Sequence, residues 1–154
     1  MQHFLLQVIL HNVTHNWAKF TAGQKKAIKD QTLALLMPLS AALSPTTTPQ
    51  PHLAQKVADI LSELAKREWP QQWPHFHTQL LQLAMQNGLP AVQAAVATFA
   101  SLSEDATSLL YQMQLPGKRR AQLREGLRGI HTELVALCLK FARAVFPQLK
   151  SANR

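Results

Sequence analysis

Apolar residues recur along the chain with the spacing of an α-helix, and no long stretch alternates apolar and polar residues as a half-buried strand would. In residues 53–64, for example, the apolar positions fall at i, i+4, i+7, i+8 and i+11, which places them on one helical face. The stripe from Leu127 to Val145 follows a 3-4-3-4-4 spacing in the same way. These patterns predict helices over about 2–15, 22–38, 52–67, 74–87, 90–110 and 118–146.

Proline-rich segments separate the predicted helices. Residues 44–51 hold three Pro and three Thr, which cannot continue a helix. Trp69-Pro70 and Trp73-Pro74 stop the helix before them, because Pro disfavours the helical conformation of its predecessor. Pro74 is also suited to open the next helix, since the first helical residue needs no hydrogen-bonded N–H. Thr21 is a suitable N-cap for the second helix.

Six helices with mostly short connections pair naturally as three antiparallel hairpins, over about 2–38, 52–87 and 90–146. The pairs recur at roughly 40–50 residues, the period of HEAT and armadillo repeats. We therefore expect an all-α fold, a right-handed α-solenoid of about three hairpins in which residues 1–154 form a single segment. A closed helical bundle is the alternative architecture.

The most distinctive segment is Lys66–Phe76, with the sequence KREWPQQWPHF. Two Trp-Pro dipeptides in such close succession predict a rigid corner, because each Pro limits its own backbone and that of its predecessor. The indoles are large enough to fill the wedge between the flanking helices. We interpret the set as a structural corner, with ligand stacking as the alternative. Its members are Trp69, Pro70, Trp73, Pro74 and Phe76.

Positive charge is concentrated at the end of the chain. Residues 118–154 carry nine of the sixteen basic and two of the eight acidic residues, and so hold +7 of the formal +8. The densest part is Lys118, Arg119, Arg120, Arg124 and Arg128. Cations at a helix start oppose the macrodipole, by at most about 1 kcal/mol each. This placement indicates contacts with phosphates or with an acidic protein surface, and a solvated helix face is the alternative.

A second basic cluster, Lys25, Lys26 and Lys29, covers about one turn of the second helix, and an acidic protein surface is a candidate partner for it.

Several other patterns point away from catalysis and metal binding. The single cysteine, Cys138, excludes an internal disulfide framework, and it lies on the apolar stripe where we expect burial. The pairs His11/His15 and His75/His77 lack a third ligand. Gly126-Leu-Arg-Gly129 matches a nucleic-acid-binding GxxG loop, but its place inside a helical stripe favours close helix packing. We expect no enzyme activity, no metal and no cofactor. No membrane-spanning segment and no signal peptide are predicted.

The Trp-Pro corner and Phe76 resemble the N-terminal repeats of the karyopherin-β exportins, members of the importin-β superfamily. The opening segment 4–13, followed by Trp17, resembles the preceding helix of those proteins. The segment 115–120, with the sequence LPGKRR before a long amphipathic helix, resembles a linker of the exportin-5 type and favours it over the exportin-1 type. The resemblance covers about residues 4–145. The Pro/Thr-rich segment 44–51 departs from it.

The resemblance implies a nuclear export receptor built from HEAT repeats. Such receptors bind the GTP form of the small GTPase Ran together with RNA or protein cargo, and they shuttle between nucleus and cytoplasm. They are several times longer than 154 residues, so we expect a monomeric segment of a longer solenoid without membrane contact. Two alternatives remain. One is a stand-alone helical RNA-binding module that uses residues 118–128, and the other is a structural fragment without autonomous activity.

Overall fold

The computed structural model describes residues 2–37, 51–107 and 115–152, and the side chains of 4–37, 52–107 and 115–146. The elements in these ranges are α1 (Gln2–Asn16), a 3-10 turn η1 (Trp17–Lys19), α2 (Ala22–Ala34), α4 (Pro51–Glu68), α5 (Phe76–Gln86), α6 (Gly88–Thr107), α7 (Gly117–Gly129) and α8 (His131–Ala152). Thr21 caps α2 as predicted, in a capping box with Gln24. Most of the Pro/Thr-rich segment, residues 44–50, lies outside the described residues.

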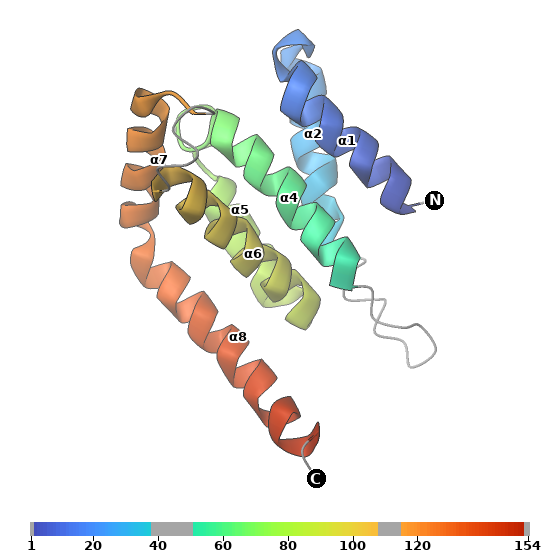
Figure 1. Cartoon of the computed structure of the whole chain (residues 1–154), viewed down its shortest axis with the longest axis vertical. Coiled ribbons are helices and arrows are strands. Elements are labelled where there is room, and N and C mark those ends of the chain that lie inside the picture. The colour runs from blue at the N-terminus through green and yellow to red at the C-terminus, as the bar shows by residue number, and fades with distance from the viewer. Residues whose placement is uncertain (1, 38–50, 108–114, 153–154) are drawn as a thin grey trace.

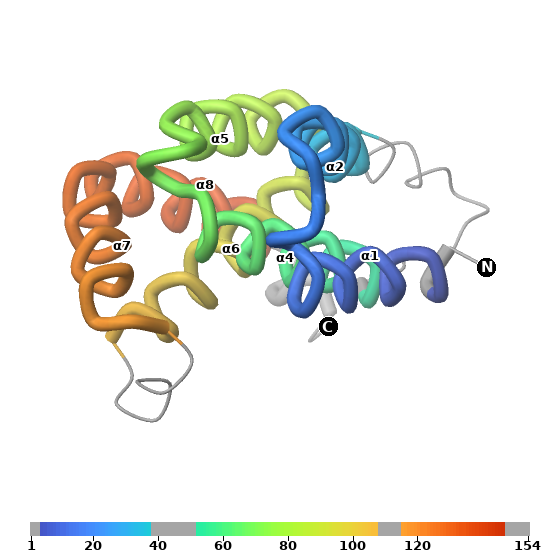
Figure 2. The backbone as a smooth tube through the Cα atoms, turned by 90° about the horizontal axis from the view of Figure 1, so that it is seen from above, coloured from blue at the N-terminus to red at the C-terminus, as the bar shows by residue number. Residues whose placement is uncertain are grey.

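The helices form two layers. Helices α1, α4 and α6 run side by side in one layer, and α2 and α5 run in the opposite direction in the other (Figures 1 and 2). Helix α6 contacts both α7 and α8, which close the end of the array. The most extensive contacts join neighbouring hairpins, above all α4 with α6 and α1 with α4. This arrangement confirms the predicted all-α fold of antiparallel helix pairs and the solenoid over the closed bundle.

Helix α4 lies at the centre of the core. Its apolar stripe, which includes Val57, Ile60, Leu61 and Leu64, is fully buried, because α1 covers it on one side and α6 on the other. On α6 the facing residues are mostly small, such as Ala91, Ala94 and Ala95, so the two helices approach closely along their length. The periodicity of residues 53–64 therefore marked the central helix of the fold.

Two predicted helix boundaries were wrong. The single helix over 118–146 is divided at Ile130, which has φ −117° and ψ 15° and ends α7. The side chain of Ile130 is 5% exposed and lies in the core at this break. The Ile130 carbonyl accepts a hydrogen bond from the N–H of Leu134, which begins α8. The fourth helix begins at Phe76 rather than Pro74, because Trp73 and Phe76 close a turn through a backbone hydrogen bond of 3.1 Å.

The ends of two other helices differ from the predicted ends by a few residues. The helix over 22–38 ends at Ala34 within the described residues, and residue 38 lies outside them. Helix α6 starts two residues early, at Gly88, whose φ of 75° suits a glycine. It is continuous to Thr107, and residues 108–110 of the predicted helix lie outside the described part.

Candidate interaction surfaces around the end of α4

The Trp-Pro corner follows α4 directly and is packed into the core. Trp69 is 1% and Phe76 0% exposed, with their rings 6.2 Å apart in an edge-on arrangement. The ring of Trp73 lies 4.7 Å from that of Phe76, and its Nε1 donates to Oε1 of Gln79 at 3.0 Å. Pro70 and Pro74 lie between these aromatic residues in the turn that leads to α5. All three aromatic side chains are thus part of the hydrophobic core.

Helix α7 rests on this corner through a glycine. A Cβ atom added at Gly126 would lie 2.7 Å from Cη2 of Trp69, closer than real Cβ contacts allow. At Gly129 an added Cβ would meet no atom within 4 Å. The GxxG match therefore belongs to a helix whose first glycine provides room for an indole, in line with the close-packing interpretation.

Arg119 joins α7 to the end of α4. Its Nε donates to the Lys66 carbonyl at 2.7 Å and its Nη2 to the carbonyls of Ala65, at 3.1 Å, and of Trp69. Its Nη1 donates to the side-chain oxygens of Gln71, at 2.6 Å, and Gln122, at 3.1 Å. These five bonds match the five N–H donors of the guanidinium, and three of the acceptors are carbonyls at the end of α4 or directly after it, of which that of Ala65 also accepts from the Trp69 N–H.

This geometry corrects the prediction for Arg119. The side chain has no donor left for a phosphate or for an acidic partner, and it acts instead as a cap on another helix. Burial lowers the pKa of Arg119, and the negative charge of Glu68 opposes this shift. No local pattern in the chain indicates this role, because Arg119 and Ala65 are 54 residues apart.

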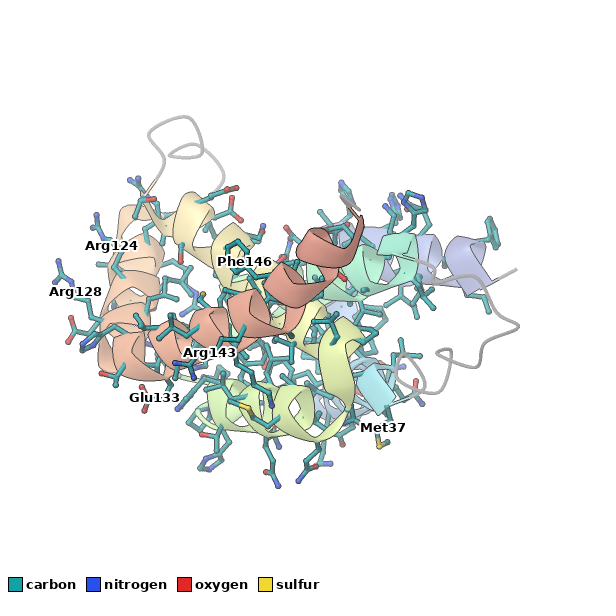
Figure 3. The ribbon with its side chains drawn as sticks, turned by 90° about the horizontal axis from the view of Figure 1, so that it is seen from below. Met37, Arg124, Arg128, Glu133, Arg143 and Phe146 are labelled. Carbon is teal, nitrogen blue, oxygen red and sulfur yellow. The ribbon has the colours of Figure 1, made fainter. Side chains whose placement is uncertain are left out.

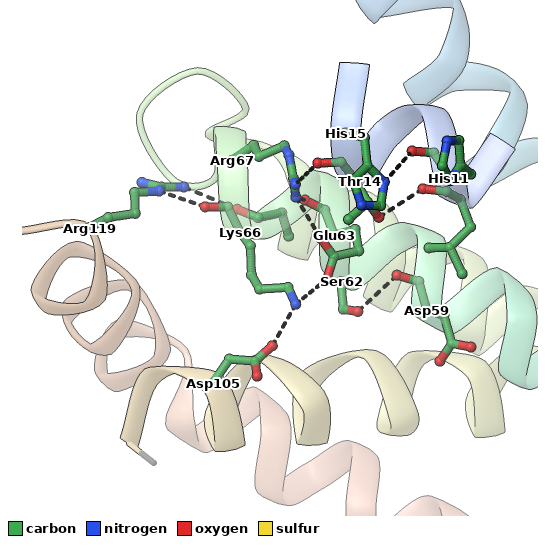
Figure 4. Close-up of polar contacts among 12 residues, drawn as sticks. His11, Thr14, His15, Asp59, Ser62, Glu63, Lys66, Arg67, Asp105 and Arg119 are labelled. Carbon is green, nitrogen blue, oxygen red and sulfur yellow. Dashed lines mark hydrogen bonds and ion pairs between the residues drawn. The ribbon is translucent and has the colours of Figure 1, made fainter. Parts of the chain in front are cut away.

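A network of ion pairs links three helices at the same place (Figure 4). Glu63 of α4 pairs with Lys66 and, at 2.6 Å, with Arg67 of the same helix. Lys66 also pairs with Asp105 of α6 at 2.7 Å, and Arg67 donates to the Thr14 carbonyl of α1 at 2.7 Å. The spacing of Glu63, Lys66 and Arg67 on one helix was a visible signal that the sequence reasoning missed.

The network shifts the pKa values of two of its members. Burial by itself would raise the pKa of Glu63, but hydrogen bonds and charge from Lys66 and Arg67 hold it below its usual value. Burial by itself would lower the pKa of Lys66, but its hydrogen bonds to Asp105 and Glu63 raise it above its usual value. Each charge is therefore stabilised by its partners in the folded state.

The three lysines of α2 have different surroundings. Lys29 is mostly buried, pairs with Glu68 at 3.0 Å and lies over the ring of Trp73, so the structure corrects its assignment to a partner surface. Lys26 forms an exposed pair with Asp30 at 2.5 Å. The Nζ of Lys25 lies 5.5 Å from the ring centre of Trp17 and has no carboxylate partner within the described residues.

The remaining basic residues of α7 differ in how far they are exposed. Arg120, Arg124 and Arg128 follow one another at four-residue spacing, and we call this row the α7 ridge. Arg124 and Arg128 are exposed and point away from the body of the molecule (Figure 3). Arg120 is half-buried, and its Nε has no hydrogen-bond partner in the described part of the chain. Neither these three residues nor the exposed Lys118 forms an ion pair with any described residue.

An apolar surface on α8 was also missed. The side chains of Val135, Leu139 and Phe146 are 57%, 51% and 61% exposed. Cys138 belongs to the same exposed side, which corrects the expectation that it is buried. The predicted stripe does face inward, with Ile130 and Leu137 buried, so α8 is apolar on two sides.

Three of the four histidines in the two pairs lie beside another ring. The rings of His11 and His15 stack with centres 4.6 Å apart, and the ring of His77 lies 6.1 Å from that of Trp69. No group of three His, Cys, Asp or Glu side chains suited to a metal ion occurs among the described residues. Within the same part of the chain, no helix combines the length and hydrophobicity needed to cross a membrane.

Comparison with known proteins places this arrangement in a family. The family model described as Exportin 1-like protein matches residues 50–152, more than half of the chain. The chain belongs to the exportin 1-like family. The match includes the Trp-Pro corner, the ion pairs among Glu63, Lys66, Arg67 and Asp105, and the α7 ridge, whereas α1 and α2 lie outside it. Exportins are transport receptors rather than enzymes.

Individual exportins show the same relationship. The chain is 27% identical to Exportin-5 of Homo sapiens over 127 residues, which are 82% of this chain and 10% of that protein. It is 24% identical to Exportin-5 of Dictyostelium discoideum over 153 residues, 97% of this chain and 13% of that protein. Exportin-5 of Mus musculus is 26% identical over 127 residues. The chain therefore spans about a tenth of the length of these relatives, and the predicted resemblance to exportin-5 is confirmed.

Proposed function

We propose that the chain acts as the N-terminal segment of a nuclear export receptor, which binds the GTP form of Ran together with RNA or protein cargo. It shuttles between nucleus and cytoplasm as a monomer. The observation that carries the proposal is the exportin family match over residues 50–152, in a chain folded as stacked helical hairpins. Such a stack of hairpins presents an extended surface to its ligands. When two ligands both favour the same curvature of the stack, they bind cooperatively.

The α7 ridge supplies a contact surface for an anionic partner. Its guanidinium groups lack acidic partners among the described residues, so their charge remains available to a phosphate or to an acidic protein surface. Lys118 adds an exposed positive charge at the start of α7, two residues before Arg120. Of the eight basic residues predicted from the sequence, we retain Lys118, Arg120, Arg124 and Arg128, together with Lys25 and Lys26, as contact candidates.

The exposed apolar residues at both ends of the array support the proposal that 1–154 is one segment of a longer solenoid. Phe4 and Leu5 of α1 are 69% and 55% exposed, and α8 exposes Val135, Leu139 and Phe146 at the other end. Internal repeats of a solenoid bury such faces against their neighbours. Further hairpins before α1 and after α8 would therefore cover both surfaces.

The nucleotide dependence of Ran binding tests the receptor proposal. Purified chain is immobilised and offered Ran loaded either with GDP or with a non-hydrolysable GTP analogue. We expect retention of the GTP-analogue form only, and weaker retention by Arg124→Glu and Arg128→Glu than by the control Lys56→Glu, which changes the charge equally on α4. Equal retention of both nucleotide forms, or retention of neither, contradicts the proposal for this segment.

Direct RNA binding is the second candidate function, and the three guanidinium groups in one row favour it. Binding through phosphates weakens steeply with salt. For a short RNA hairpin we expect Arg124→Ala and Arg128→Ala each to lower the slope of log K against log salt by about 0.7–0.9. RNA binding without any Ran binding would favour the stand-alone module over the receptor, whereas a slope unchanged in both variants would remove the ridge from RNA contact.

A further inference from the structure

A cleft opens where the ends of four elements meet. Its volume is about 600 Å³, and its walls come from the end of α1 with η1, the start of α2, the end of α4 and the start of α7. Apolar wall residues include Trp17, Ala18, Leu115 and Pro116. The polar wall is basic and contains Lys25, Lys66, Arg67 and Arg119, with Glu68 as the acidic member. Figure 4 shows Arg119 reaching the end of α4, where Lys66 extends toward Asp105 and Arg67 toward Thr14.

Ion pairing around the cleft leaves two positive charges in excess. Lys66 and Arg67 share Glu63 and Asp105, and Glu68 pairs with Lys29. Lys25 and Arg119 have no carboxylate partner among the described side chains. Arg119 contributes only its electric field, because intramolecular bonds occupy all its donors. Lys25 is different, since its ammonium makes a cation–π contact with Trp17 and retains its N–H donors for a ligand.

We propose that this cleft binds a short acidic peptide segment, in which a carboxylate contacts Lys25 and a neighbouring apolar side chain lies against Ala18, Leu115 and Pro116. The proposal is independent of the receptor function. The volume falls within the range of about 300–1,000 Å³ that ligand sites occupy, and the combination of apolar walls with few convergent polar groups is typical of them.

The chemistry of the cleft favours a carboxylate over a nucleic acid. A duplex presents a long row of phosphates and needs a matching row of exposed cations, which the α7 ridge has and the cleft lacks. Inside the cleft Lys25 is the ammonium without an ion-pair partner among the described residues, and Glu68 adds negative charge nearby. In a peptide with an acidic side chain beside an apolar one, the acidic side chain would contact the basic wall and the apolar side chain would contact the apolar wall.

Fluorescence anisotropy with the full chain tests the proposal. The probe is a fluorescein-labelled peptide with an Asp-Leu-Asp centre between Gly-Ser flanks, and the matched peptide carries Asn-Leu-Asn. Since a hydrogen bond to a charged group contributes about 1.5–3 kcal/mol, we expect Lys25→Ala to weaken binding of the acidic peptide by about 10- to 100-fold. Lys25→Arg retains most of the affinity, because the positive charge stays in place.

Lys26→Ala is the matched control, because it removes the same charge from the next position of α2, where Lys26 pairs with Asp30 outside the cleft. It weakens binding less than about twofold if the cleft is the site. Circular dichroism and the thermal midpoint verify that each variant is folded. Equal losses for the two alanine variants, equal binding of the two peptides, or no saturable binding overturns the proposal. Lys25-dependent binding of a duplex RNA in place of the peptide overturns it as well.

Discussion

One added methyl group at Gly126 tests how closely α7 packs on the Trp-Pro corner. In Gly126→Ala the new Cβ would lie 2.7 Å from Cη2 and 3.0 Å from Cζ2 and Cζ3 of Trp69. Carbon atoms in contact prefer about 3.5–4.0 Å, so one of the two groups must move by roughly 1 Å. Trp69 is only 1% exposed and lies against Phe76, which leaves its indole little room to retreat.

The magnitude follows from two opposing effects. Overpacking a well-packed site costs about 1–3 kcal/mol. Replacing Gly by Ala within a helix returns about 0.5–1 kcal/mol, because the unfolded chain loses conformational freedom. Gly126→Ala should therefore lower the free energy of unfolding by about 0.5–2 kcal/mol. Gly129→Ala meets no atom within 4 Å in the same helix and should leave the stability equal or slightly higher.

Urea unfolding measures both variants. Tryptophan fluorescence follows the corner, and far-UV circular dichroism follows the helices. A lower midpoint for Gly126→Ala with an unchanged slope would show a loss of stability without a change in the unfolding transition. If Gly126→Ala proves as stable as Gly129→Ala, then α7 does not rest on Trp69 in solution, and the placement of the α7 ridge beside the corner is wrong.

Four further predictions concern the polar network and the surface. Arg119→Lys should lower the free energy of unfolding by about 2–3 kcal/mol, because the three donors on the one nitrogen of an ammonium cannot reach the five oxygens that the guanidinium contacts, whereas the exposed Arg124→Lys should change it by less than about 0.5 kcal/mol in the same urea titration. The pKa of Glu63 is lowered from 4.5 on folding, so its stabilisation is present above that value and is lost as the pH falls through the folded-state pKa. Glu63→Gln should accordingly flatten the acid limb of a stability–pH profile. The pKa of Lys66 is raised from 10.5, so its contribution is intact below that pH and is lost as the pH rises through the folded-state pKa, a loss that Lys66→Met should abolish. The exposed Cys138 should react with a thiol reagent in the native protein nearly as fast as in urea, and strong protection would place α8 differently.

The features that could be predicted from the sequence are those that depend on a local pattern. Periodicity over 53–64 identified the buried face of α4, and the Trp-Pro dipeptides identified the corner, because both signals lie within a few residues. Contacts between distant segments could not be predicted in this way. Lys29 looked like its neighbours on α2, yet its partner Glu68 is 39 residues away. The break at Ile130 was missed for a related reason, since a continuous apolar stripe has the same spacing whether or not the helix is interrupted.

The basic block at the start of α7 combines two roles that have the same appearance in the sequence. Cations there oppose the dipole of α7, but the guanidinium of Arg119 reaches the carbonyl end of α4, where positive charge is favourable. The cost at one helix terminus is thus offset at another. Arg124 and Arg128 have no such contact and remain exposed. Neutralising the whole block would therefore combine loss of a cap with loss of a binding surface, and only variants confined to the α7 ridge report on partners.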